Sequence, residues 1–113
     1  MGNLRKLDVV LAEKLGYEVD ICQEDFLMYR EDIDKWVLVP YWSTESEAML
    51  ELDREMWGKG YFLRFICGGS LFIAIYVQDD TDYSFSDFSL AKNEPLARAL
   101  AAYKALTGKE WEG

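Results

Sequence analysis

Apolar residues recur at helical spacing close to the N-terminus. Leu4, Leu7, Leu11 and Leu15 follow one another at intervals of three or four residues, with charged residues between them. Gly16 comes directly after the last of them, at the position where a helix commonly ends. This pattern predicts an amphipathic helix in the first sixteen residues.

A second helical pattern starts near residue 44. Thr44 and Glu47 have the spacing of a capping box, in which each side chain satisfies a free backbone N–H at the start of a helix. Apolar residues then gather on one side of a helical wheel as far as Trp57. We expect this helix to end at Gly58 or Gly60.

The third helical pattern lies near the C-terminus. It begins at the Asn93-Glu94-Pro95 segment, because proline is tolerated in the first turn of a helix. A stripe that includes Leu96, Leu100 and Tyr103 continues to Leu106, and the Thr107-Gly108 pair indicates the end. Alanines beside the stripe allow another backbone to approach closely. The chain therefore carries three predicted helices.

Residues 61–67 and 70–78 are rich in β-branched and aromatic residues and flank a pair of glycines. A two-residue turn at Gly68-Gly69 predicts a β-hairpin in which Phe65 lies across from Phe72 and Arg64 from Ile73. Both faces of this hairpin are apolar. We therefore expect both faces to be covered, or the hairpin to lie centrally in a larger sheet.

The remaining segments have weaker patterns. Tyr17, Val19 and Ile21 alternate with polar residues as in a short strand, and residues 36–40 read as a strand or extended segment. Residues 23–35 are acidic, which favours an irregular connection, although residues 26–29 could form a short strand. Residues 79–92 are predicted to form an acidic, aromatic loop.

These elements predict an α+β fold. We expect a small, mainly antiparallel sheet with helices packed on both faces, an α/β/α sandwich. The 113 residues fit a single domain, 1–113, with an ordered core over about residues 4–107 and a short C-terminal tail. A chain of this length can bury a core without disulfides or metals.

The composition excludes more classes of function than any motif does. Lys and Arg number 12 against 21 Asp and Glu, for a net charge of −9, so direct nucleic-acid binding is not expected. Histidine is absent, which removes the usual general base and the commonest metal ligand. The acidic run Asp79-Asp80-Thr81-Asp82 lacks the glycine and glutamate of an EF-hand loop. We expect no enzyme activity, no cofactor and no metal.

Two cysteines, Cys22 and Cys67, are too few for a disulfide framework or a zinc site, and we expect both to be buried free thiols. The N-terminal residues have no apolar signal core. Residues 61–77 are slightly short for a membrane span and include Arg64 and two glycines. These features predict a cytoplasmic protein without a membrane segment.

The order of segments resembles the phage ABA sandwich family of small phage and prophage proteins. The likeness rests on residues 7–16, 39–44 and 94–100 and extends over about residues 4–107. It implies helices flanking a small antiparallel sheet and a viral or prophage origin, and it transfers no catalytic residues. Residues 17–35 depart from the family pattern because they are longer and more acidic.

Candidate binding residues are mainly aromatic. Trp36, Tyr41 and Trp42 form either an exposed recognition patch or, as we prefer, core positions ahead of the second helix. Tyr83 and Phe85, with Phe88, form either an edge strand or a partner-binding loop.

Arg64 is the single charge in the predicted hairpin, and Asp53 is the single acid in the apolar arc of the second helix. We expect the two to form a buried ion pair. The alternative is that Arg64 lines a pocket for a small anion.

The function expected from these observations is that of a non-enzymatic phage or prophage protein that binds a host or viral partner. Its negative charge favours a partner with a basic surface, although it equally serves solubility. One alternative is binding or sequestering a small anionic ligand, and another is a structural or assembly role in the virion. A homodimer is also compatible with the two apolar hairpin faces.

Overall fold

The computed structural model describes residues 3–22, 25–78 and 82–112. The strands of these residues form two antiparallel three-stranded sheets. One consists of β1 (Val19–Cys22), β2 (Asp25–Arg30) and β3 (Lys35–Leu38). The other consists of β4 (Tyr61–Gly68), β5 (Leu71–Gln78) and β6 (Ser89–Ala91), with a short 3₁₀ turn, η1 (Phe85–Asp87), before β6. The predicted α+β class is therefore confirmed.

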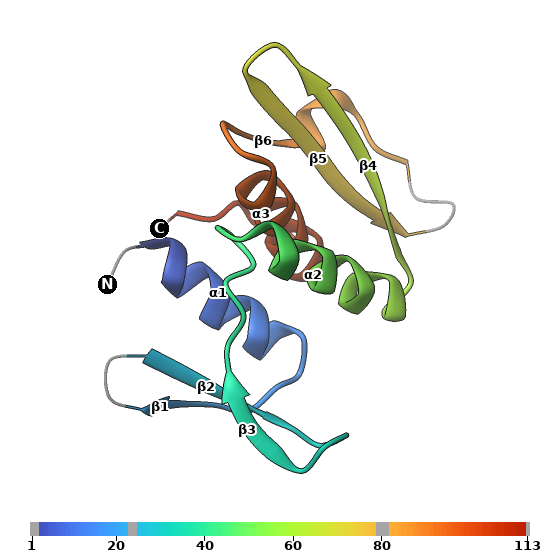
Figure 1. Ribbon diagram of the computed structural model, residues 1–113. Coiled ribbons are helices and arrows are strands. Elements are labelled where there is room, and N and C mark those ends of the chain that lie inside the picture. Colours follow the sequence, from blue (N-terminus) through green and yellow to red (C-terminus); the bar gives the residue numbers. More distant parts are fainter. Residues whose placement is uncertain (1–2, 23–24, 79–81, 113) are drawn as a thin grey trace.

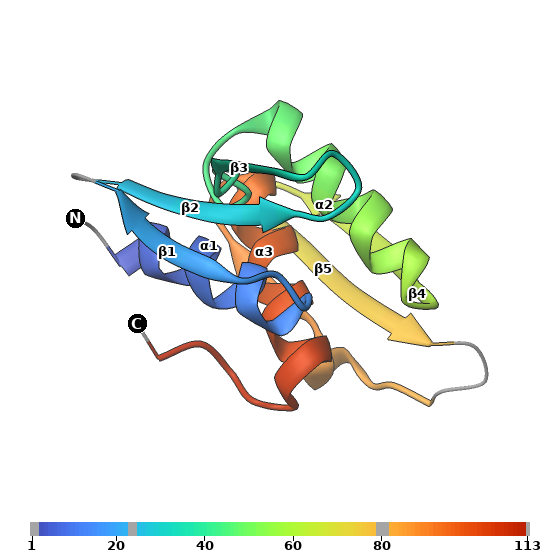
Figure 2. The same ribbon diagram turned by 90° about the horizontal axis from the view of Figure 1, so that it is seen from below.

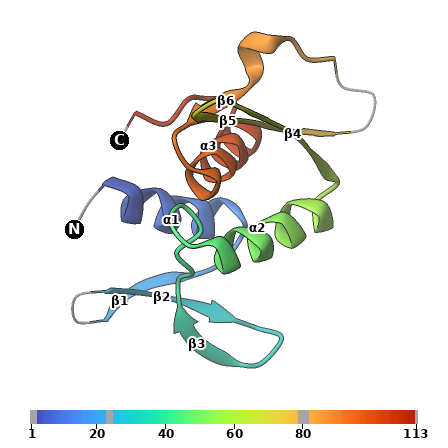
Figure 3. The ribbon, with the colours of Figure 1, turned by 45° about the horizontal axis from the view of Figure 1, so that its top comes forward.

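Three helices lie between the two sheets (Figure 1). They are α1 (Asn3–Lys14), α2 (Ser46–Gly58) and α3 (Glu94–Thr107). Helix α3 packs against α1, α2, β5 and β6, and a turned view shows the same sequence of layers (Figure 3). Seen from below, the β1–β2–β3 sheet lies in front of the helices (Figure 2).

This order of layers corrects the expectation of a single sheet between helices. Residues 17–38, whose acidic part we expected to be irregular, supply a complete second sheet that covers the helices from the other side. The helices serve two sheets because different helices face them: α3 packs against β5 and β6, α1 packs against β1, and α3 also packs against α1 and α2. The buried residues of α3 are Pro95, Ala97, Ala99, Ala101 and Ala102.

Helix ends largely follow the sequence. Gly16 and Gly108 both adopt positive φ just beyond α1 and α3, and the Asn93 side chain accepts a hydrogen bond from the N–H of Leu96 at 3.0 Å. The capping box predicted for α2 does not form. Helix α2 begins at Ser46 and has no side-chain cap, because the preceding residues make a turn in which the Thr44 N–H bonds to the Tyr41 carbonyl.

The hairpin exists, but its predicted register is wrong. Phe65 lies opposite Ala74, and Arg64 lies opposite Ile75. The two-residue loop is Gly69-Ser70, because Gly68 still pairs with Leu71 and only Gly69 has positive φ, at 61°. The loop is displaced by one residue, so each pairing shifts by two positions. The same residues therefore still share each face of the sheet.

Candidate interaction surface

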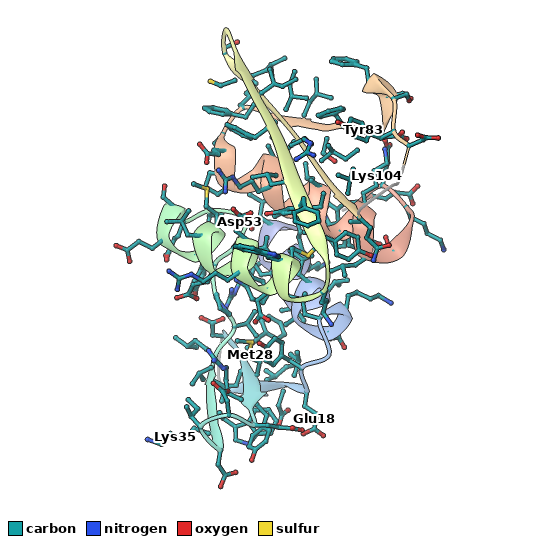
Figure 4. All side chains as sticks on the ribbon, turned by 90° about the vertical axis from the view of Figure 1, so that its right-hand side faces the viewer. Glu18, Met28, Lys35, Asp53, Tyr83 and Lys104 are labelled. Atoms are coloured by element: carbon teal, nitrogen blue, oxygen red, sulfur yellow. The ribbon has the colours of Figure 1, made fainter. Side chains whose placement is uncertain are left out.

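A groove of about 390 Å³ runs between α2 and β4. Leu50, Asp53, Arg54 and Trp57 lie three or four residues apart on α2, so they form one stripe along the helix. Strand β4 forms the opposite wall. The lining residues are Leu50, Asp53, Arg54, Trp57, Tyr61, Phe62, Leu63 and Tyr76. Figure 4 places Asp53 on α2, beside the lower part of the hairpin.

Two large apolar side chains that α2 contributes to the groove are open to solvent. Trp57 is 71% exposed and Leu50 is 52% exposed. Both belong to the apolar arc by which we predicted α2, yet only the part of that arc facing the core is buried, namely Ala48, Met49, Leu52 and Met56. The apolar arc is thus wider than the side of the helix that packs.

The exposed apolar area continues over the outer face of the β4–β5–β6 sheet, which is the face turned away from α3. Even-numbered residues of β4 and odd-numbered residues of β5 share this face. Its exposed apolar residues are Phe62, Ile66, Leu71 and Leu90. We define the β4 surface as these four residues together with Leu50 and Trp57. Exposed apolar residues that cluster in this way are typical of binding surfaces.

Arg64 lies on the outer face of β4, between Phe62 and Ile66 of the β4 surface. Its side chain is exposed, and it makes no ion pair within the described part of the chain. The predicted pairing of Arg64 with Asp53 is therefore wrong. The physical reason is the alternation of side chains along a strand, which turns Arg64 to the face opposite α3, whereas Asp53 faces α3 and β5.

The Asp53 carboxylate accepts hydrogen bonds from two side chains at the base of the groove. It accepts a hydrogen bond from the Tyr76 hydroxyl and from Arg98 Nη1, the latter at 2.9 Å. Glu94 lies 2.6 Å from Arg98 Nη2, and the guanidinium lies 5.1 Å from the centre of the Phe65 ring. Burial, and then the carboxylate beside it, raise the pKa of Tyr76 well above its ordinary value. The network joins α2, α3 and the sheet.

A second charged network surrounds Arg5. Its guanidinium donates five hydrogen bonds, to Asp8, to Asp25 twice, and to the carbonyls of Val39 and Pro40. These use all five N–H groups of an arginine. The Tyr41 hydroxyl donates to Asp25 at 2.6 Å, and this bond, followed by Arg5, lowers the pKa of Asp25 to about 2.

This network has a structural role. Arg5 lies 3.8 Å from the centre of the Tyr41 ring, so α1, β2 and the segment before α2 are all held at one point. Desolvation raises the pKa of the buried Asp8, which also accepts the N–H of Ser43 at 2.9 Å. With every guanidinium N–H already bonded, Arg5 has none left for a ligand.

The remaining candidate aromatics are dispersed. Trp42 is 1% exposed, so the core interpretation applies to it, and half-buried Tyr41 belongs to the Arg5 network. Trp36 is exposed on β3, where its ring lies 5.4 Å from that of Tyr29.

Tyr83 and Phe85 are exposed at the turn before β6 and are grouped around Phe88, with ring centres 5.8 and 6.0 Å from it. Part of the acidic run before them, residues 79–81, lies outside the described residues. Strand β6 begins only at Ser89, so these three aromatic residues lie in the turn before it and the edge-strand interpretation does not apply to them.

The structure thus places the predicted binding residues on different surfaces, and it shows further exposed residues that the sequence analysis did not select. Arg64 lies beside the β4 surface, whereas Trp36 lies on the other sheet. Leu50, Phe62 and Trp57 were not among the candidates, although the excess width of the apolar arc of α2 was a signal for two of them. Cys67 is exposed at the end of β4, contrary to the buried thiol we expected. The side chain of Cys22 lies outside the described residues.

Two features are absent from the described part of the chain. It contains no group of three or more cysteine, aspartate or glutamate side chains placed to hold a metal ion. None of the helices in the same residues has the length and hydropathy needed to cross a bilayer.

Comparison with known proteins shows a likeness in fold. No protein-family model matches the chain, and no curated protein matches it. The crystal structure of a phage protein from Bacillus cereus ATCC 14579 superimposes with a TM-score of 0.67 at 14% sequence identity, covering 99% of this chain and 94% of that chain. At this identity the likeness concerns the fold, and this chain accordingly shares its fold with a phage protein.

Proposed function

We propose that this is a phage- or prophage-encoded interaction protein that acts without catalysis, by binding a partner protein through the β4 surface. The observation that carries the proposal is the set of exposed apolar side chains in the groove and on the neighbouring outer face of the β4–β5–β6 sheet. The fold shared with a phage protein supports the origin, and membership of the phage ABA sandwich family is part of the same proposal.

The β4 surface is favoured over the other exposed apolar patch. That patch, on the outer face of the β1–β2–β3 sheet, includes Trp36 and Leu38. Charged residues border it, among them Arg30 and Asp32, which pair with each other at 2.7 Å. The β4 surface has a groove at one side, a shape that lets a partner bury side chains in it instead of only covering the surface.

The alternative of a small anionic ligand held by Arg64 has less support. Small-ligand sites are concave and enclose most of the ligand. Arg64 instead stands exposed on the face of a sheet, outside the residues that line the groove. A structural or assembly role in the virion is compatible with the β4 surface and predicts that the protein is found in purified particles.

The proposal is tested by comparing surface variants in affinity capture from a host lysate, followed by binding measurements with the purified partner. Trp57→Ala and Ile66→Ser should each weaken binding at least tenfold, because both remove exposed apolar area from the β4 surface. Trp36→Ser is the matched control, since it removes an exposed aromatic side chain from the other sheet. Equal loss in all three variants, or loss in Trp36→Ser alone, would contradict the proposed surface.

A further inference from the structure

Strand β4 is an edge strand that is long and regular. It pairs only with β5 within the described residues, in one unbroken register over eight residues, without proline or a bulge. Its other edge therefore presents unpaired backbone N–H and C=O groups, and no described residue bonds to them. Such an edge is a template for another strand, and proteins usually protect it.

The groove lies directly beside this open edge. The stripe of α2 that contains Leu50 and Trp57 forms one wall, and Leu63 of β4 forms part of the other. In an added strand, alternate side chains would point toward the helices and the rest toward the outer face. The first set would enter the groove against Trp57, and the second set would lie beside Phe62 and Arg64.

We propose that an extended segment of a partner protein adds to the sheet as a strand alongside β4 and places its alternate apolar side chains in the groove. This inference rests on the proposed function and specifies its mode of binding. Backbone hydrogen bonds along an edge supply affinity in such complexes, and pockets for alternate side chains supply specificity.

Charge identifies the chemistry of the segment. Arg64 on β4 and Arg54 on α2 are exposed at this site, and neither forms an ion pair within the described residues, although the chain carries a net charge of −9. Exposed arginines without carboxylate partners favour an acidic residue on the incoming strand. The segment is therefore an alternation of apolar and polar residues with a carboxylate opposite or diagonal to Arg64.

A second copy of the chain is a poorer occupant for the same reason. When two β4 strands pair antiparallel about their middle with their outer faces on the same side, the two Arg64 side chains come opposite or diagonal to each other. Like charges at such positions are destabilising, and the two chains also repel through their net charge.

The probe for the test is a synthetic library of eight-residue peptides. Four alternate positions carry Leu, Val, Ile or Phe, and the other four carry Thr, Glu or Lys. Selection on the full chain should enrich peptides with Glu at one central polar position. N-methylation of alternate backbone nitrogens on the edge facing β4 should weaken the best peptide at least tenfold, and hydrogen exchange should show new protection of β4 amides.

Charge reversal tests the role of Arg64 directly. Arg64→Glu should reverse the preference, so that the Lys form of the best peptide binds the variant better than the Glu form does. Arg30→Glu, on the other sheet, is the control and should leave the preference unchanged. If charge reversal does not change the preference, the assignment of the carboxylate to Arg64 is overturned.

The other outcomes separate this inference from the proposed function. Affinity unchanged by N-methylation, or no enrichment of any peptide at millimolar concentration, overturns strand addition. The proposed function fails independently if Trp57→Ala and Ile66→Ser retain the captured partner. Sedimentation that shows a dimer dependent on β4 would instead identify a second copy as the occupant and overturn the choice of partner.

Discussion

Asp53 of α2 and Arg98 of α3 form an ion pair of 2.9 Å that closes the space between the two helices beneath the groove. The side chain of Arg98 is 12% exposed and that of Asp53 is 32% exposed, so the pair is largely shielded from water. The Tyr76 hydroxyl also donates to Asp53, which links β5 to both helices. The position of the stripe that lines the groove depends on this contact.

Disrupting this pair should destabilise the fold. Arg98→Met should lower the free energy of unfolding by about 2–3 kcal/mol, because Asp53 and Glu94 lose their cation in a partly dry site. Combined with Asp53→Leu, the loss should be smaller than the sum of the two single losses by about 1 kcal/mol. Urea unfolding measures all three variants.

The exposed pair between Lys104 and Glu110 is the control for this cycle. Its atoms lie 3.4 Å apart at the surface, so Glu110→Gln should change the free energy of unfolding by less than about 0.5 kcal/mol. Strictly additive losses for Arg98→Met and Asp53→Leu would show that the two residues are not coupled.

Arg5 is predicted to be irreplaceable by lysine. Arg5→Lys keeps the charge but has three donors in place of five, so the four partners, Asp8, Asp25 and the carbonyls of Val39 and Pro40, cannot all remain bonded. The free energy of unfolding should fall by about 2–4 kcal/mol. The neighbouring exposed Lys6 is the control, and Lys6→Met should cost less than about 0.5 kcal/mol. If Arg5→Lys and Lys6→Met lower the free energy of unfolding equally, the structural role assigned to Arg5 is wrong.

Acid should destabilise the protein partly through Asp25. Its pKa is lowered to about 2 in the folded state from an ordinary value of 3.8, first by the Tyr41 hydroxyl and then by Arg5. A lowered carboxyl pKa contributes stability in full above the unfolded value, and the contribution is lost as the pH falls through the folded value. The wild type should therefore lose more stability between pH 5 and pH 2 than Asp25→Asn does. Urea unfolding across this range measures the difference, and parallel curves would contradict it.

The two glycines of the hairpin should respond differently to alanine. Gly69 has φ of +61°, which L residues rarely adopt, so Gly69→Ala should cost about 1 kcal/mol. Gly68 lies in the strand opposite Leu71, with open space where an added Cβ would lie, so Gly68→Ala should be neutral or slightly stabilising. Thermal unfolding of both variants tests the observed register, and a cost at Gly68 with none at Gly69 would favour a Gly68-Gly69 loop.

The sequence predicted local features well because short-range chemistry controls them. The Asn93 side chain accepts the N–H of Leu96 at the start of α3, and Gly108 adopts the positive φ that ends the helix. Both features depend only on residues close in the sequence. The alternation along the hairpin survives the register error, because a shift of two positions keeps the same residues on each face of β4 and β5. The register was wrong because a glycine pair offers two places for a tight turn, and only pairing between the strands selects one of them.

The interaction surface was less accessible to sequence analysis. Trp57 and Leu50 have the spacing of core residues on α2, and only the positions of α3 and β4 leave them exposed. The ion-pair partner of Asp53 was missed for the same reason, because Arg98 lies on a different helix, 45 residues further along the chain. Sequence patterns describe which side of an element is apolar, but they do not reveal which neighbour covers it.

Three helices and an apolar hairpin can be predicted from the sequence alone because periodicity and capping residues act locally. The acidic charge and the absence of histidine follow directly from the composition. Packing between distant elements places the helices between two sheets, pairs Asp53 with Arg98 and leaves the outer edge of β4 unpaired by any described residue, beside a groove. These outcomes depend on how the apolar areas of distant elements match when they pack together, and such packing leaves the residues of the β4 surface exposed.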